Sequence, residues 1–202
     1  MISRISSVWS ACIVAVLMAG IPTVYAQAPS DFAGEPDKSM ASAQEAFLKG
    51  DMNKAAEHIQ KAASYVRTQE GKVAKGASKT LKKAGDDLER LGGEVKKGAV
   101  KSPDQLKKTF AQVDHALATA WHATADQEQK SGRDATNALV KAGAGLEGAA
   151  KWTGTQLNTG AQAAVDALNK AGEGAKLGAG TVGRFFTGIG EGIADVGKRL
   201  TR

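Results

Sequence analysis

The C-terminal part of the chain repeats apolar residues at helical spacing from residue 157 to residue 200, and this pattern constrains the fold most strongly. The average step is about 3.6 residues, so the apolar stripe stays on one face of a helix. No segment after residue 26 alternates apolar with polar residues or runs in β-branched ones, which are the patterns typical of strands. The sequence therefore predicts an all-α protein. The stripe consists of Leu157, Ala161, Ala164, Leu168, Ala171, Ala175, Ala179, Val182, Phe186, Ile189, Ile193, Val196 and Leu200.

Glycines accompany this stripe in unusual number. Most of them border it, and only Gly180 and Gly188 are predicted to lie on the polar face. Each glycine disfavours a helix by about 1 kcal/mol relative to alanine, but a small residue lets another backbone approach closely. We therefore expect this helix to form only when its apolar face is covered. The bordering residues are Gly172, Gly183, Gly190 and Gly197 on one side, and Gly174, Gly178 and Gly192 on the other.

Three coverings fit this helix: the protein's own helices, a lipid surface, or a partner protein, which includes a second copy and hence a homo-oligomer. Phenylalanine and isoleucine on one face with basic residues opposite resemble cationic peptides that lie in the membrane interface. Glu191 and Asp195 argue against a lytic peptide, and charges throughout the polar face argue against a spanning helix. The predicted lipid- or partner-binding residues are Val182, Arg184, Phe185, Phe186, Ile189, Ile193, Val196, Lys198, Arg199 and Leu200.

The first 26 residues are typical of a cleaved signal peptide. Arg4 precedes a short apolar run, and Val24 and Ala26 fit the small-residue cleavage pattern. The only cysteine, Cys12, lies inside this run, so the exported chain has neither disulfides nor a thiol nucleophile. We expect a periplasmic or cell-envelope protein of a bacterium. Export argues against nucleic acid as a partner, so the net charge of +6 favours an anionic membrane surface or an acidic polysaccharide.

Residues 27–38 contain two prolines and Gly34, and are expected to form a flexible leader. The next segment, residues 43–64, contains a Gly50–Asp51 step that ends one helix and caps the next. It resembles a single tetratricopeptide-type helical hairpin. That family stacks at least about three copies, and only one occurs here, so the resemblance implies a helical hairpin without a peptide-binding groove.

The remaining segments of the predicted bundle, residues 39–202, are a hairpin with a Lys-rich helix (39–100), a central helix (103–150) and the Gly-rich helix (153–201). Breaks are expected near Gly71, within 92–98 and near Gly132. Ser102, Pro103 and Gln105 form a strong helix start. The predicted fold is thus an elongated, partly flexible up-down bundle. The small, charged composition of 71–101 resembles late-embryogenesis-abundant stress proteins, many of which stay disordered until they bind.

Catalytic motifs are absent from the sequence: it has no phosphate-binding loop, nucleophile elbow or zinc-protease histidine pair. His115 and His122 are seven residues apart on one helix face, opposite the face of Leu106 and Phe110, and with His58 they are weak candidates for a metal site. We therefore predict a non-enzymatic protein without cofactor that binds lipid or protein through its C-terminal helix. The alternatives are a soluble periplasmic stress or chaperone-like protein and a histidine-based metal binder.

Overall fold

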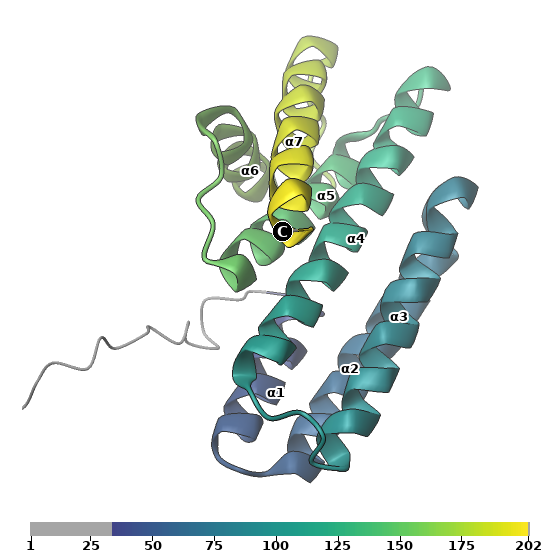
Figure 1. Ribbon diagram of the computed structural model, residues 1–202. Coiled ribbons are helices and arrows are strands. Elements are labelled where there is room, and N and C mark those ends of the chain that lie inside the picture. The colour runs from purple at the N-terminus through teal and green to yellow at the C-terminus, as the bar shows by residue number, and fades with distance from the viewer. Residues whose placement is uncertain (1–33, 202) are drawn as a thin grey trace, which may run out of the picture.

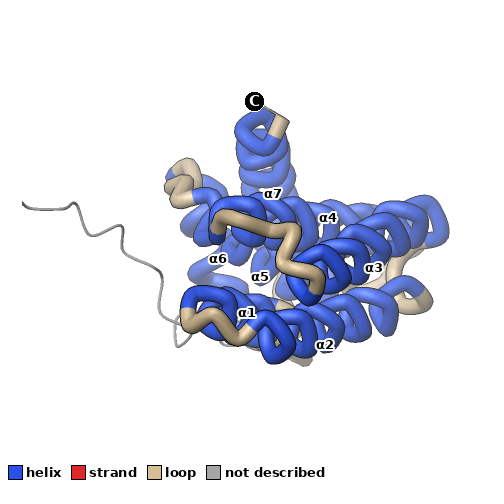
Figure 2. Tube along the Cα trace, turned by 60° about the horizontal axis from the view of Figure 1, so that its bottom comes forward, coloured by secondary structure: helices blue, strands red, loops and turns tan. Residues whose placement is uncertain are grey.

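The computed structural model describes residues 34–201, and within them helices joined by turns and loops are present without any strand (Figures 1 and 2). The all-α prediction is confirmed for this part of the chain. The predicted signal peptide and residues 27–33 of the leader lie outside the described residues. The seven helices found in residues 34–201 are α1 (Asp37–Leu48), α2 (Met52–Glu70), α3 (Lys75–Lys96), α4 (Pro103–Lys130), α5 (Thr136–Thr153), α6 (Thr159–Ala171) and α7 (Ala179–Leu200).

Two helix starts follow the sequence signals. The Asp51 side chain accepts a hydrogen bond from the backbone N–H of Lys54 (3.0 Å), which begins α2. The Ser102 hydroxyl accepts one from the N–H of Asp104 (3.1 Å), which begins α4. Gln105 reaches back to the N–H of Lys101 (3.0 Å), one residue before the cap that a standard capping box would bond. These caps fix where the long antiparallel helices turn.

The helix boundaries differ from the predictions at several places. The break expected near Gly132, whose φ is +66°, separates α4 from α5, so the predicted central segment 103–150 is two helices. The predicted Gly-rich helix is likewise two helices, α6 and α7, because Gly172 (φ +76°) and Gly174 (φ +86°) adopt left-handed conformations that end α6. Helix α1 begins at Asp37, so the predicted leader ends two residues early. Helix α3 runs through Gly92 and Gly93 and ends before Gly98 (φ +66°).

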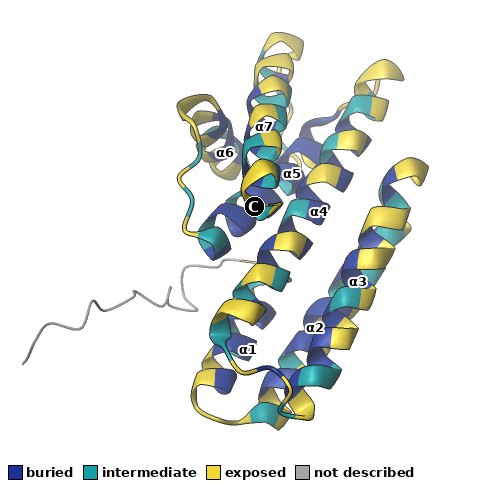
Figure 3. Ribbon diagram, viewed as in Figure 1, coloured by how far each residue is buried: buried dark blue, intermediate teal, exposed yellow. Residues whose placement is uncertain are grey.

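The core consists of two hydrophobic clusters that meet on α4. The first lies between α1, α2, α3 and the N-terminal part of α4, and includes Phe110, Ile59 and Leu81. The second lies between the C-terminal part of α4 and α5, α6 and α7, and includes Leu139, Leu146 and Ile189. Buried residues line the inward faces of all these helices (Figure 3). Many core positions are alanine, so the helices are held by close backbone approach along their length.

Helix α7 lies against three other helices: α4, α5 and α6. In Figure 1 it runs beside α4, with α3 on the other side of α4. None of the helices in residues 34–201 combines the length and the hydropathy needed to cross a bilayer.

Candidate functional site

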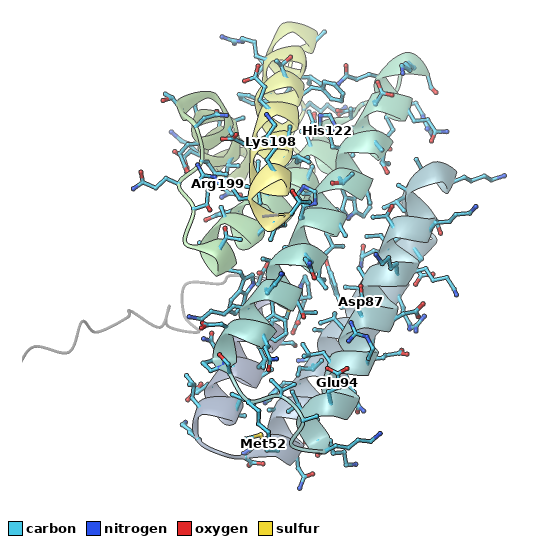
Figure 4. All side chains as sticks on the ribbon, in the orientation of Figure 1. Met52, Asp87, Glu94, His122, Lys198 and Arg199 are labelled. Atoms are coloured by element: carbon cyan, nitrogen blue, oxygen red, sulfur yellow. The ribbon has the colours of Figure 1, made fainter. Side chains whose placement is uncertain are left out.

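Helix α7 carries all ten of the predicted interaction residues, and its apolar face is turned toward the bundle. Val182, Ile189 and Val196 are buried in the second cluster. The other four apolar members are half-buried against it: Phe185, Phe186, Ile193 and Leu200. Arg184, Lys198 and Arg199 are exposed, the last two at the C-terminal end of α7 (Figure 4). In this structure the apolar face is thus covered by the protein's own helices.

Two histidines of α4 bind the backbone of α7. His122 Nε2 lies 3.0 Å from the carbonyl oxygen of Phe186, and His115 Nε2 lies 3.0 Å from that of Ile193. A carbonyl only accepts hydrogen bonds, so Nε2 carries the proton in both histidines. The histidines are seven residues apart, and so are the carbonyls. The two helices run antiparallel, so the same contact is made twice along their interface.

A glycine makes each of these contacts possible. Gly190 and Gly197 follow the two acceptor residues by four positions, and therefore lie one turn further along the same face. A Cβ atom at Gly190 would lie 3.1 Å from His122 Nε2, and one at Gly197 would lie 2.8 Å from His115 Nε2. Any larger residue would displace the imidazole. We call these six residues the histidine–glycine seam: His115, His122, Phe186, Gly190, Ile193 and Gly197.

The opposite side of α7 packs on α5 and α6 through two further glycines. A Cβ at Gly188 would lie 2.8 Å from the carbonyl oxygen of Gly160, and one at Gly192 would lie 2.6 Å from Leu146 Cδ2. The prediction that Gly188 lies on the polar face is wrong, because the break before α7 lets α6 fold back onto that side. By contrast, a Cβ at Gly180 or Gly183 would meet nothing within 4 Å. The glycines of α7 therefore differ in role.

The histidines are not assembled into a metal site. His115 and His122 both direct Nε2 at carbonyls of α7, and His58 lies on α2. Among residues 34–201, no group of three His, Cys, Asp or Glu side chains is placed to hold a metal ion. The sequence correctly placed His115 and His122 on one helix face, but did not identify their partners on α7.

A second polar feature, which the sequence analysis missed, is a pair of carboxyl groups between the two clusters. Asp114 on α4 is fully buried and forms a hydrogen bond with Asp37, the first residue of α1. The indole N–H of Trp152 donates to Asp37 Oδ1 (3.3 Å). Gly148 leaves room for the pair, since a Cβ there would lie 2.7 Å from an oxygen of each aspartate. We call Asp37 and Asp114 the buried acid pair.

Burial raises the pKa of both carboxyl groups. Loss of hydration raises the pKa of Asp37 to about 6, although its hydrogen bonds with Asp114 and Trp152 oppose the rise. Loss of hydration, and then the charge of Asp37, raise the pKa of Asp114 well above the usual range for a carboxyl group. At neutral pH the pair therefore holds a proton between its two groups. A signal was present in the sequence, because Asp114 lies four residues after Phe110 and three before Leu117, on the apolar face of α4.

Comparisons of the chain with protein-family models, with curated proteins and with solved structures find no match. Function is therefore inferred from the residues of this chain.

Proposed function

We propose that this chain is a non-enzymatic, exported envelope protein that binds an anionic membrane surface through its C-terminal helix pair, α6 and α7. In this proposal α7 exchanges its covering: its apolar face leaves the bundle and enters the membrane interface. The observation that carries the proposal is the way α7 is attached to the bundle. Glycine contacts and two histidine–carbonyl hydrogen bonds hold it, and only three of its larger apolar side chains are buried.

The composition of α7 supports an exchange of this kind. Six glycines lie within the helix, and each costs about 1 kcal/mol of helix stability relative to alanine. The helix thus depends on whatever covers its apolar face. The three buried side chains, Val182, Ile189 and Val196, contribute about 1.5–3 kcal/mol each. These opposing terms are similar in size, so a competing apolar surface has little to overcome.

The charges beside α7 favour an anionic surface. Arg184 lies next to Phe185, and Lys198 and Arg199 are exposed at the other end of the helix. A second group of exposed lysines begins just before α3 and continues along its first turns, and α3 lies across α4 from α7 (Figure 1). Each basic residue near an anionic leaflet contributes about 1 kcal/mol. The lysines of this group are Lys72, Lys75, Lys79, Lys82 and Lys83.

The test is co-sedimentation of the purified protein with vesicles of phosphatidylglycerol and phosphatidylethanolamine, and with vesicles of phosphatidylcholine alone. We expect binding to the anionic vesicles that weakens between 50 and 500 mM salt, as screening requires (both concentrations being roughly chosen working values). Replacing Arg184, Lys198 and Arg199 together by glutamine should remove most of the binding. Phe185→Glu should remove it as well, because the half-buried ring would no longer enter the interface.

A matched glycine pair tests the exchange itself. Gly192→Ala pushes α7 away from Leu146 and should increase vesicle binding, whereas Gly183→Ala adds the same methyl group where nothing lies within 4 Å. Hydrogen exchange reports whether α7 has loosened. If α7 loosens in Gly192→Ala and neither this variant nor the wild type binds anionic vesicles, the proposal is overturned. The bundle would then keep α7 for stability or for a protein partner.

A further inference from the structure

A cavity of about 240 Å³ opens beside the buried acid pair. It lies where the start of α1 meets α4 and α5. Polar and aromatic side chains from five parts of the chain line it: Asp37, Tyr65, Asp114, Trp121, Lys141 and Glu173. The backbone of Gly145 forms part of the wall, where α5 approaches α4 most closely.

Asp114 is the least satisfied group in this cavity. Both of its oxygens are inaccessible to solvent, and apart from the hydrogen bond with Asp37 neither accepts a well-formed hydrogen bond from a described protein donor. The indole N–H of Trp152 donates to Asp37 (3.3 Å), and it also partly offsets the rise in the pKa of Asp114 that burial causes. Once the pair is ionised, a buried carboxylate without a donor costs about 1–3 kcal/mol or more. Its position at a cavity wall therefore points to a group from outside the chain.

We propose that this cavity binds a small organic cation through a primary ammonium group, with Asp37 and Asp114 as its acceptors. An ammonium carries three N–H donors and no acceptor, which suits the ionised pair: Asp37 accepts one N–H, from Trp152, and the oxygens of Asp114 accept none in good geometry. The cavity lining also has an excess of negative charge, with Glu35, Asp37, Asp114 and Glu173 against the single amine of Lys141.

The chain itself places an ammonium in the same cavity. Lys141 Nζ lies 4.5 Å from the centroid of the Trp121 ring and 3.9 Å from Glu173 Oε1. Aromatic faces attract cations by about 0.5–2 kcal/mol. The wall formed by Trp121 is thus suited to a cation, and the alkyl part of a ligand can lie against Leu117 and Val140.

The size and the ligand set argue for an organic ion over a metal. Calcium takes about six to eight oxygen ligands, and among the described residues no three candidate ligands converge on a metal position. The cavity is smaller than the 300–1,000 Å³ (roughly) of sites for drug-sized molecules. A short alkylamine is therefore the class of ligand that fits.

Binding should release a proton. The free pair holds a proton between its two carboxyl groups, whereas an ammonium is best bound when both groups are ionised. The cation takes over the role of the proton, so about one proton should leave for each ligand bound. Affinity should accordingly rise with pH until the free pair is itself fully ionised.

The experiment is isothermal titration calorimetry of the full chain with butylamine, butanol and butyrate at pH 7.5, in two buffers of different ionisation enthalpy. These probes share one alkyl chain and differ in charge. We expect only butylamine, which is protonated at this pH, to bind. The difference in binding enthalpy between the two buffers should report the release of about one proton.

Asp114→Asn should weaken butylamine binding about tenfold or more. Lys141→Met should tighten it, because it removes the competing cation. Asp126→Asn changes an exposed carboxylate paired with Lys130 and should leave affinity unchanged.

Three outcomes would overturn the proposal: no binding of butylamine, equal binding of butanol, or binding that Asp114→Asn leaves intact. Stronger binding of calcium or magnesium chloride, measured in the same way, would also overturn it. If Asp114→Asn does not fold, two other measurements still test the proposal: the proton release when the wild type binds butylamine, and the butylamine affinity of Lys141→Met. None of the exposed basic residues of α7 lines this cavity, so failure here leaves the vesicle experiment unaffected.

Discussion

His122 contacts Phe186 twice: its Nε2 lies 3.0 Å from the carbonyl oxygen, and the two rings stack with centroids 4.0 Å apart. His115, seven residues earlier, repeats only the hydrogen bond, to Ile193. The histidine–glycine seam is therefore uneven, and its stronger end lies toward the start of α7.

We expect His122→Ala to destabilise the protein more than His115→Ala. Losing the hydrogen bond costs about 0.5–1.5 kcal/mol in either variant, and the lost ring stacking adds about 0.5–1.5 kcal/mol for His122 alone. Urea unfolding monitored by circular dichroism measures the difference. The pair His122→Ala and Gly190→Ala should be non-additive, because the alanine at 190 is costly only while the imidazole is present. Equal losses for the two histidines, or strict additivity, would contradict this account.

The contact between α4 and α5 predicts opposite results for two glycines of one helix. A Cβ at Gly145 would lie 2.8 Å from the backbone nitrogen of Ala118 and 2.9 Å from the carbonyl oxygen of Asp114, and neither atom can rotate away. Gly145→Ala should therefore cost about 1–3 kcal/mol. At Gly143 the nearest atom would be Leu168 Cδ1 at 3.5 Å, an ordinary contact. Gly143→Ala should be neutral or stabilise by up to about 1 kcal/mol. Thermal unfolding of both variants is the measurement, and a shared sign would be inconsistent with the close approach.

The buried acid pair should make stability fall as pH rises. Folding raises the pKa of Asp37 from 3.8 to about 6, and burial raises that of Asp114 well above its usual value. A group whose folded pKa is raised stabilises the protein below its unfolded pKa, and that contribution is lost as pH rises through the folded value. For Asp37 the loss spans roughly pH 4–7. Lys151, which lowers the pKa of Asp37, and Glu147, which raises it, also face this group from α5.

Asp114→Asn tests this dependence. The amide removes the like charge and can donate to Asp37, so the variant should be more stable than the wild type at pH 8, with a smaller change between pH 5 and pH 8 (both approximate working values). Urea unfolding at the two pH values gives the difference. Exposed carboxylates are common to both proteins, so their contributions cancel. A wild type that loses no stability relative to the variant on going to pH 8 would mean that the pair shares no proton.

The cap at Ser102 should stabilise α4. Its hydroxyl satisfies the N–H of Asp104, so Ser102→Ala should cost about 1 kcal/mol. Ser64 offers a control, because its exposed hydroxyl only donates to the Gln60 carbonyl within α2. Ser64→Ala should be neutral or slightly stabilising, since alanine favours a helix more. Similar losses in chemical denaturation for both serines would assign no special role to the cap.

Local signals in the sequence located many helix boundaries. The caps at Asp51 and Ser102 and the turns at Gly50 and Gly132 depend on neighbouring residues only, so they could be read directly. The break between α6 and α7 could not, because the apolar repeat keeps its phase through residues 172–178. Glycines are so frequent there that composition could not distinguish Gly172 and Gly174, which turn the chain, from the glycines of α7 that pack against other helices.

The histidine–glycine seam and the buried acid pair depend on tertiary contacts, so the sequence alone could predict only part of each. The seven-residue spacing of His115 and His122 was readable, and so was that of Gly190 and Gly197, but only the fold shows that one pair faces the other. Asp114 interrupts an apolar stripe and could have been noticed. Its partner could not, because Asp37 follows a proline-containing segment that suggested a leader.

The shared position of α4 between the two clusters has a consequence for the order of folding. Helices α1 to α4 contact one another through short connections, and such local topology folds fast. The same helix then presents Ala118, Trp121 and Ala125, which belong to the second cluster, as a surface still to be covered. Helix α5 can pack onto this surface of α4 directly, because only the turn at Gly132 separates the two helices. Helix α7 packs on α4, α5 and α6, so it can pack fully only after α5 and α6 are in place. The helices should thus pack in order from the N-terminus to the C-terminus. Helix α7 should pack last during folding and should be the first to detach from the bundle.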